Sequence, residues 1–119
     1  MGGLSGCAGG IVMRIVQYIT AQGKNHFGDW FARIPATHAQ RVTEALYRME
    51  RGNLGDHKSV GAGVMERRIF GTPALRLYYG MDGKDLVILL IGGTKHKQDK
   101  DIEKAKALWE AYQAEKSRK

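Results

Sequence analysis

The side chains of this chain best suited to chemistry are basic residues on predicted strands. Arg76 lies within residues 75–79, where alternation places Arg76 and Tyr78 on one face of a strand and the leucines on the other. Arginine stabilises negative charge that develops in a transition state, and removal of one such donor costs roughly 100- to 1000-fold in rate. The pattern predicts contact with an anion; a plain surface arginine and a pair with Glu66 are the alternatives.

A second arginine, Arg68, shares a face of the preceding predicted strand with Glu66. Contact with phosphate and pairing with Glu66 are equally compatible with this position. His57 and Lys58 lie in the glycine-rich segment before that strand, where they either contact an anionic ligand or are solvated loop residues.

The third basic feature is the turn formed by Lys95, His96 and Lys97. A turn of this composition, close to the start of a helix, can hold an anion, although it can also be a solvated turn. Histidine is the side chain that titrates near neutrality, which makes His96 a candidate general acid or base, although a lone surface histidine is often inert.

The other histidines do not suggest a metal site. His26 and His38 fall on predicted helices, away from the basic strands, and no histidine pair has ligand spacing with carboxylates. We therefore predict no metal and no cofactor.

Composition supports a small basic domain with an anionic partner. The chain has 119 residues, with 19 Lys and Arg against 12 Asp and Glu, a formal charge of +7. Nucleic acid is the favoured partner class, ahead of an acidic protein and a membrane surface. The single cysteine, Cys7, excludes an internal disulfide and fits the cytoplasm. Residues 1–12 contain five glycines and no charge, and are interpreted as a flexible extension or a remnant of cloning; residues 13–119 form the domain.

Two helices and a third at the end are predicted from apolar residues at helical spacing. Phe27, Trp30, Phe31 and Ile34 form the first stripe, and Val42, Ala45, Leu46 and Met49 the second. Thr37 and Gln40 have the spacing of a capping box, Gly52 supplies a stop, and the last helix starts at Asp99.

Strands are predicted from runs of β-branched, aromatic and apolar residues, at 14–19, 64–70, 75–80 and 86–91. Residues 52–63 are predicted to be loop, Asp82-Gly83 a hairpin turn, and Gly92-Gly93 the break that ends the last strand. The run 86–91 is apolar on both faces, which is typical of a strand covered on both sides. The order β-α-α-β-β-β-α predicts an α+β domain with a twisted, mainly antiparallel sheet packed against helices.

Several of these segments, in this order, resemble the HigB-like "addiction module killer" branch of the RelE/ParE toxin superfamily across residues 14–111. The segments that carry the resemblance are Phe27 with Trp30-Phe31, then 52–56 (GNLGD), 66–69 (ERRI), 75–79 (LRLYY), 87–95 (VILLIGGTK) and 98–105 (QDKDIEKA).

The resemblance implies the toxin of a type II toxin–antitoxin module, neutralised by an antitoxin, which we expect to be a small helix-turn-helix protein in a toxin–antitoxin hetero-oligomer. RelE-like and HigB-like relatives cut mRNA at the ribosome without a metal, inhibiting translation and growth. ParE-like relatives inhibit DNA gyrase on the same scaffold, and a fold does not decide between the two. A third alternative is a nucleic-acid-binding module without toxicity.

Carried onto this chain, the resemblance assigns phosphate contact to Arg76. It assigns the same role to Arg68, on the preceding strand, and to Lys95, at the corner after the last strand. We expect Arg76, Arg68, Lys95 and His96 to be catalytic, and Arg67, Lys97, Lys58 and Tyr78 to contact RNA. Arg67 departs from the pattern, because relatives more often carry an apolar residue there; it is either exposed on a bent strand or part of the phosphate footprint. The tyrosine base of RelE-like relatives would fall near Asp101, where this chain has no tyrosine, so the cleavage mechanism stays open.

Overall fold

The computed structural model describes residues 12–117, so the predicted extension at residues 1–12 lies almost wholly outside the described part of the chain. The elements are β2 (Arg14–Gln17), α1 (His26–Arg33), α2 (Ala36–Glu50), β3 (His57–Gly61), β4 (Val64–Ile69), β5 (Leu75–Met81), β6 (Leu86–Thr94), the 3₁₀ turn η1 (Lys95–Lys97) and α3 (Gln98–Ser117). The predicted α+β class is confirmed, with one strand more than expected.

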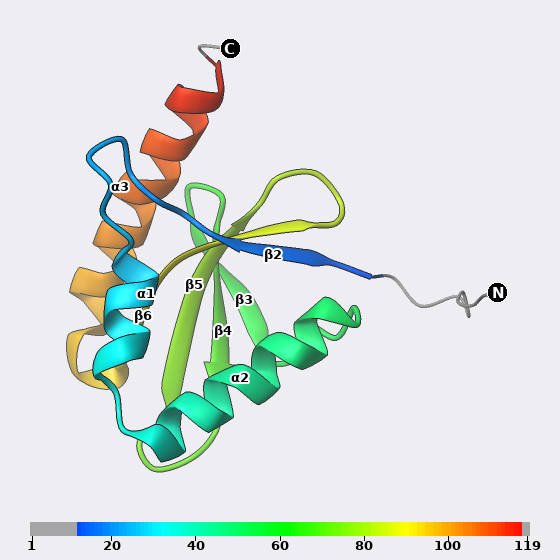
Figure 1. Ribbon diagram of the computed structural model, residues 1–119, viewed down its shortest axis with the longest axis vertical. Helices are drawn as coiled ribbons and strands as arrows, with labels where there is room; N and C mark the ends of the chain where they lie inside the picture. Colours follow the sequence, from blue (N-terminus) through cyan, green and yellow to red (C-terminus); the bar gives the residue numbers. More distant parts are fainter. Residues whose placement is uncertain (1–11, 118–119) are drawn as a thin grey trace, which may run out of the picture.

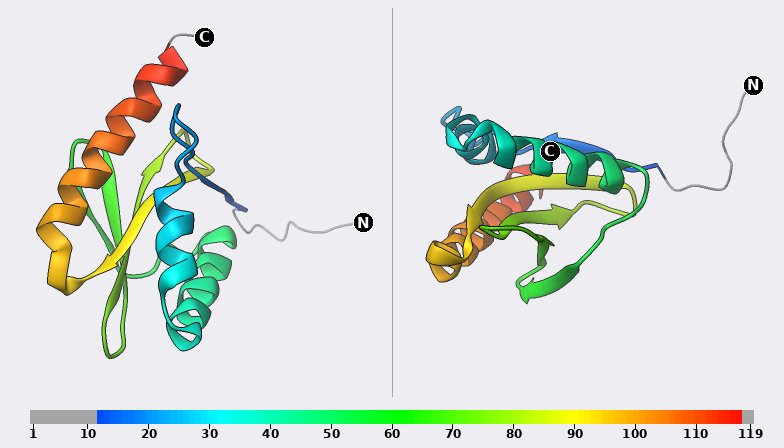
Figure 2. Two further views of the ribbon diagram at one scale, coloured as in Figure 1. Left: turned by 60° about the vertical axis from the view of Figure 1, so that its left-hand side comes forward. Right: turned by 90° about the horizontal axis from the view of Figure 1, so that it is seen from below.

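The strands form one twisted five-stranded sheet in the order β2-β6-β5-β4-β3. β2 runs parallel to β6, and the other neighbours are antiparallel. Figure 1 shows α1 and α2 in front of the strands, and Figure 2 shows α3 on the opposite side of the sheet. The sheet therefore has two covered faces, which we call the α2 face and the α3 face.

Each face has its own apolar core. On the α2 face, Phe27, Val42 and Met49 of the helices pack with Leu77 and Leu89 of the sheet. On the α3 face, helix residues Leu108 and Trp109 pack with strand residues Tyr78, Ile88 and Leu90. Because β6 contributes buried residues to both cores, the prediction of a strand covered on both sides is confirmed.

Local sequence explains where the helices begin and end. The Asn25 side chain caps α1 by accepting a hydrogen bond from the Gly28 amide at 2.8 Å. Gly52 ends α2 with a φ of +92°, and its amide donates to the Met49 carbonyl. The predicted capping box at Thr37 is wrong, because α2 already begins at Ala36, with Pro35 before it and no side-chain cap.

Two further predictions about strands are wrong for reasons of tertiary packing. Residues 57–61 are not loop but an edge strand, β3, which pairs with β4. Gly92-Gly93 does not end β6, which continues to Thr94. A Cβ on Gly92 would lie 2.3 Å from the Trp30 ring, and one on Gly93 would lie 2.1 Å from an Asp101 carboxylate oxygen. The glycines thus let a helix approach the strand closely rather than breaking it.

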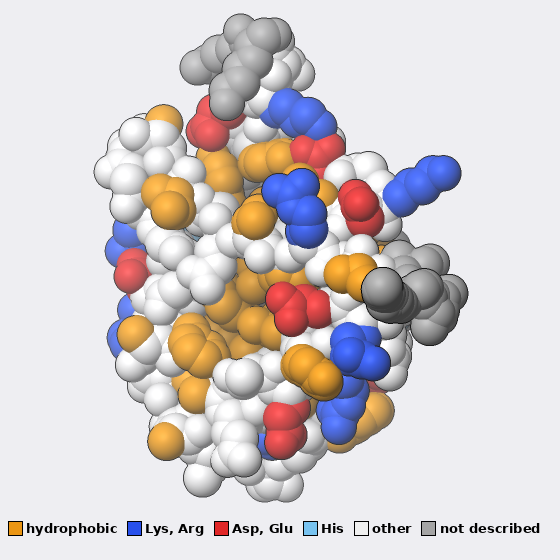
Figure 3. All heavy atoms as spheres, turned by 45° about the vertical axis from the view of Figure 1, so that its right-hand side comes forward, with side chains coloured by type: hydrophobic (Ala, Val, Ile, Leu, Met, Phe, Trp, Pro, Cys, Tyr) orange, Lys and Arg blue, Asp and Glu red, His pale blue; other side chains and the backbone are white. Residues whose placement is uncertain are grey.

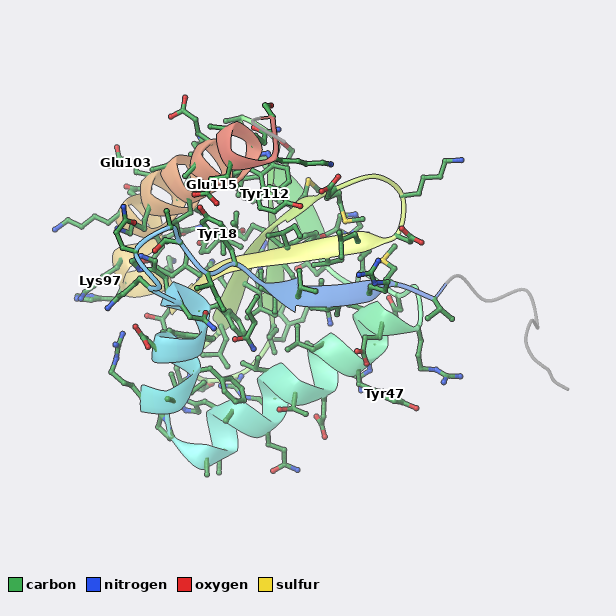
Figure 4. All side chains as sticks on the ribbon, turned by 45° about the horizontal axis from the view of Figure 1, so that its top comes forward. Tyr18, Tyr47, Lys97, Glu103, Tyr112 and Glu115 are labelled. Carbon is green, nitrogen blue, oxygen red and sulfur yellow. The ribbon has the colours of Figure 1, made fainter. Side chains whose placement is uncertain are left out.

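The segment after β2 is anchored to α3 instead of extending the strand to Ile19 as predicted. The Tyr18 hydroxyl donates to Glu115 at 2.7 Å, and its ring meets Tyr112 edge-on, an arrangement visible in Figure 4. Burial, followed by the hydrogen bond to Glu115, raises the pKa of Tyr18 to about 12. Within residues 12–117, none of the helices is both long enough and apolar enough to cross a bilayer.

Candidate functional site

Polar residues on the α3 face form two rows across neighbouring strands. The register of β4, β5 and β6 places Arg68 opposite Arg76 and Arg76 opposite Gly93. The row beside it contains Lys58, Glu66 and Tyr78, from β3, β4 and β5. Three strands thus bring basic residues from distant parts of the chain onto one face.

Glu66 is the centre of a buried ionic cluster, here called the Glu66 cluster, which comprises Lys58, Glu66, Arg76, Tyr78 and Gln98. Glu66 is only 2% exposed, and its Oε2 accepts hydrogen bonds from the Tyr78 hydroxyl and from Gln98 Nε2, each at 2.9 Å. Arg76 Nε lies 3.6 Å from the same oxygen, and Lys58 Nζ lies 4.0 Å from Oε1. A buried carboxylate is tolerated when cations and donors surround it in this way.

The cluster holds Arg76 and Tyr78 inside the domain. Arg76 is 6% exposed and Tyr78 is fully buried, so they do not form the open positive surface that alternation along the strand predicted. Burial and then the hydrogen bond to Glu66 raise the pKa of Tyr78 far above its usual range, which makes its hydroxyl a donor and not a base. The alternative in which Arg76 pairs with Glu66 is the one that the structure shows.

Arg68 lies at the open edge of the same face. Its Nε is 3.3 Å from Asp56, and its guanidinium lies 5.8 Å from the centre of the Phe70 ring. Asp56, rather than Glu66, is therefore its carboxylate partner. The side chains of Arg68 and Lys58 are 40% and 59% exposed, so they are the cations that an incoming anion would meet first.

Asp101 brings a second carboxylate to these rows from the first turn of α3. Its oxygen reaches the backbone at Gly93, the residue opposite Arg76. Burial raises the pKa of Asp101, and the charge of Lys97 opposes this shift. A carboxyl group whose pKa is raised is a better proton acceptor than an ordinary aspartate.

Lys95, His96 and Lys97 are all exposed and form η1 between β6 and α3. Figure 4 shows Lys97 directed away from the body of the domain. His96, Lys97 and Asp101 line a cavity of about 510 Å³, which α1 closes with residues that include His26 and Trp30.

His26 lies on α1, away from Arg68 and Arg76 on the strands, but it lines the same cavity as His96 of the η1 turn. Burial, then the charges of Lys104 and Lys24, lower the pKa of His26, and Asp29 opposes them. Within the described residues, no cluster of three or more His, Cys, Asp or Glu side chains could hold a metal ion.

Arg67 lies on the opposite, α2 face of β4 and is 6% exposed. It is therefore not exposed on a bent strand, and that expectation is corrected. It also lies outside the Glu66 cluster, and the expectation that it contacts a phosphate stays a prediction. Of the predicted site residues, Lys58, Arg68, Arg76 and Tyr78 lie together on the α3 face. His96 and Lys97 line the cavity between α1 and α3.

Two residues of the site were not predicted from the sequence. Gln98 was treated as the residue before a helix, and Asp101 only as the place of a missing tyrosine. The available signal was their position in the first turn of α3, where side chains lie over the carboxyl end of the preceding strand. Their partners are distant in the chain, since Gln98 bonds Glu66 across 32 positions.

Fold and site define a small basic α+β domain with a buried ionic cluster beneath its last helix. No protein-family model matches the chain. An uncharacterized protein of Haemophilus influenzae (strain ATCC 51907 / DSM 11121 / KW20 / Rd) is 40% identical to it over 83 residues, which are 69% of this chain and 84% of the relative. The chain belongs to the same family as this Haemophilus influenzae protein.

Proposed function

We propose that the chain is the toxin of a type II toxin–antitoxin module, acting in the cytoplasm as a metal-independent endoribonuclease that cuts mRNA on the ribosome. The observation that carries the proposal is the row of Arg68, Arg76 and Gly93 on the α3 face, with the Asp101 carboxylate beside it. This row combines positive charge for a phosphate with a group that can accept a proton.

In the proposed reaction, a ribose 2′-oxygen attacks the adjacent phosphorus and the 5′-oxygen of the next nucleotide leaves. The products are a 2′,3′-cyclic phosphate and a 5′-hydroxyl. Asp101 accepts the proton of the 2′-hydroxyl, and His96, which lines the same cavity, donates one to the leaving oxygen. Arg68 and Lys58 bind the phosphate and stabilise its developing charge, whereas Arg76 holds Glu66 and the row in place.

Three other predicted site residues, Lys95, Lys97 and Tyr78, also have a role in this proposal. Lys97 lines the cavity, and Lys95 lies beside it in η1. Both lysines are exposed and would contact RNA phosphates that flank the scissile one. Tyr78 would act indirectly, through its hydrogen bond to Glu66.

A second surface feature, an apolar groove between β2 and α2, would accommodate an apolar helix of an antitoxin. The groove has a volume of about 300 Å³ and is lined by residues that include Ile15, Leu46, Tyr47 and Leu89. Tyr47 is 58% exposed, and Figure 3 shows hydrophobic side chains gathered in a hollow on this side of the domain. Amphipathic helices bind apolar grooves of this kind.

Inhibition of DNA gyrase without cleavage is the second candidate function. The observation that favours it is the burial of Arg76 and Tyr78, which leaves no tyrosine accessible on the basic face. A nuclease of this type needs its phosphate-binding groups within reach of RNA, whereas an inhibitor does not.

The test uses the full chain freed of any antitoxin. We expect it to cut mRNA on translating ribosomes, with and without EDTA, and to leave 5′-hydroxyl ends, while gyrase supercoiling is unaffected by an excess of the protein. Intact mRNA together with blocked supercoiling would favour the gyrase inhibitor. Intact mRNA and normal supercoiling would remove both functions.

A further inference from the structure

A second group of arginines, separate from the Glu66 cluster, surrounds a cavity of about 260 Å³ between α2 and the end of β4. Most of them lie on the α2 face, and Arg68, which belongs to the α3 face, also lines the cavity. The charged residues that line it are Arg41, Glu44, Arg48, Asp56, Arg67 and Arg68. Four arginines and two carboxylates leave a formal charge of +2. We call this cavity the Arg67 pocket.

Arg67 is the buried member of this group. Arg67 is 6% exposed, and among residues 12–117 its Nε and Nη1 atoms have no hydrogen-bond partner. A Cβ on Gly55 would lie 1.3 Å from Nη1, so the glycine makes the space in which the guanidinium sits. Burying a charged group without a partner is unfavourable, and arginine does not escape the cost by losing its proton near neutral pH.

The carboxylates near Arg67 do not compensate its charge. Asp56 forms its ion pair with Arg68, and within residues 12–117 no carboxylate lies within 4.0 Å of the Arg67 guanidinium nitrogens. Burial, then the charge of Arg48, lower the pKa of Arg67, and Tyr79 and Asp56 only partly oppose them. The environment of Arg67 therefore lacks an anion.

The rest of the pocket is arranged to receive one. Arg41, Glu44 and Arg48 recur at i, i+3 and i+7, so they share the face of α2 that lines the pocket. Arg41 is fixed by hydrogen bonds to the carbonyls of Phe70 at 3.0 Å and Pro73 at 2.8 Å, which are neutral partners that leave its charge available. Arginines held in place are the preferred donors to phosphate, because their planar fork binds two of its oxygens.

We propose that the Arg67 pocket binds a phosphate-type oxyanion, with Arg67 and Arg48 as its main donors. A dianionic phosphate would neutralise the +2 charge of the pocket, whereas a single carboxylate would leave half of it. The anion comes either from free phosphate or from a phosphate group of a nucleic acid. The proposal does not depend on RNA cleavage by the α3 face.

The test measures the affinity of the full chain for inorganic phosphate by calorimetry and by the phosphate-dependent rise in Tm, at constant ionic strength set with chloride. Arg67→Met and Arg48→Met should weaken binding about 10- to 100-fold, as expected for loss of a charge-assisted hydrogen bond. Arg14→Met removes the same charge from an exposed position on β2, at the other edge of the sheet, and should bind as the wild type does.

A parallel arm uses a short single-stranded oligoribonucleotide without terminal phosphates. Binding of phosphate alone identifies a free anion as the ligand, and tighter binding of the oligonucleotide, weakened by Arg67→Met but not by Arg14→Met, identifies a nucleic-acid phosphate. The exposed Arg48 provides a variant that tests the pocket even if Arg67→Met misfolds. Equal affinities of wild type, Arg67→Met and Arg48→Met, or binding of neither ligand, would overturn the proposal.

Discussion

Arg67 and Arg76 lie on adjacent strands, are each 6% exposed, and have opposite surroundings. Arg76 faces Glu66, a buried carboxylate that also accepts hydrogen bonds from Tyr78 and Gln98. Arg67 lies beside other arginines and a glycine. In both arginines Nε and Nη1 lack a hydrogen-bond partner among the described residues, so the difference between them is the ion pair that Arg76 forms with Glu66. The comparison shows that burial alone does not define the role of an arginine. Arg76 forms an ion pair inside the domain, whereas Arg67 is proposed to bind an external anion.

The largest effect expected from this contrast is on the Glu66 side. Glu66→Leu leaves Arg76 buried without its carboxylate, so we expect the free energy of unfolding to fall by about 3–5 kcal/mol, as for other broken buried pairs. Urea denaturation measures it. The double variant Glu66→Leu with Arg76→Leu should recover much of the loss, because both charges are removed together. A cost below about 1 kcal/mol for the single variant would mean that the cluster is not an ionic unit.

A smaller effect is expected from the glycine beneath Arg67. Gly55→Ala places a methyl group where Arg67 Nη1 lies, at a φ of +63°. Gly83→Ala is its matched control, because Gly83 has a φ of +84° and open space around it. Both should lose about 1–2 kcal/mol from left-handed strain. Only Gly55→Ala should also lose the phosphate-dependent rise in Tm; equal phosphate responses in the two variants would contradict the assignment of Gly55 to the pocket.

The smallest expected effect is a pH dependence of the free energy of unfolding that arises from Asp101, beside the α3 face. Burial raises the pKa of Asp101 in the folded protein, with Lys97 opposing. Between the pKa of the unfolded chain, about 3.9, and the raised folded value, the folded state binds more protons, so stability falls as pH rises through that window. Asp101→Asn should remove this fall while leaving the rest of the profile unchanged. Parallel stability profiles for the two proteins would show that Asp101 is not perturbed by folding.

The sequence predicted features that depend on near neighbours in the chain. The Asp82-Gly83 hairpin, the placement of Arg76 and Tyr78 on one face of β5, and the stop at Gly52 are confirmed. Each depends on local backbone geometry or on the two-residue period of a strand.

Features that depend on distant contacts could not be predicted. Gly92-Gly93 reads as a break, yet the close approach of Trp30 and Asp101 makes it part of β6. β3 exists because an open edge of β4 pairs with a glycine-rich segment that has weak strand propensity of its own. Arg67 looks like a surface residue in the sequence, and only the packing of α2 over the sheet buries it.

The central claim is that the α3 face binds and cleaves RNA, and Arg68 tests it most directly because its side chain is 40% exposed and lies outside the hydrogen bonds of the buried cluster. The measurement is the rate of mRNA cleavage on translating ribosomes for the wild type, Arg68→Ala and Arg14→Ala. We predict that Arg68→Ala slows cleavage roughly 100- to 1000-fold, the range for loss of a donor to developing charge, while Arg14→Ala cleaves at the wild-type rate. Cleavage by Arg68→Ala at the wild-type rate, or no cleavage by the wild type, would contradict the claim.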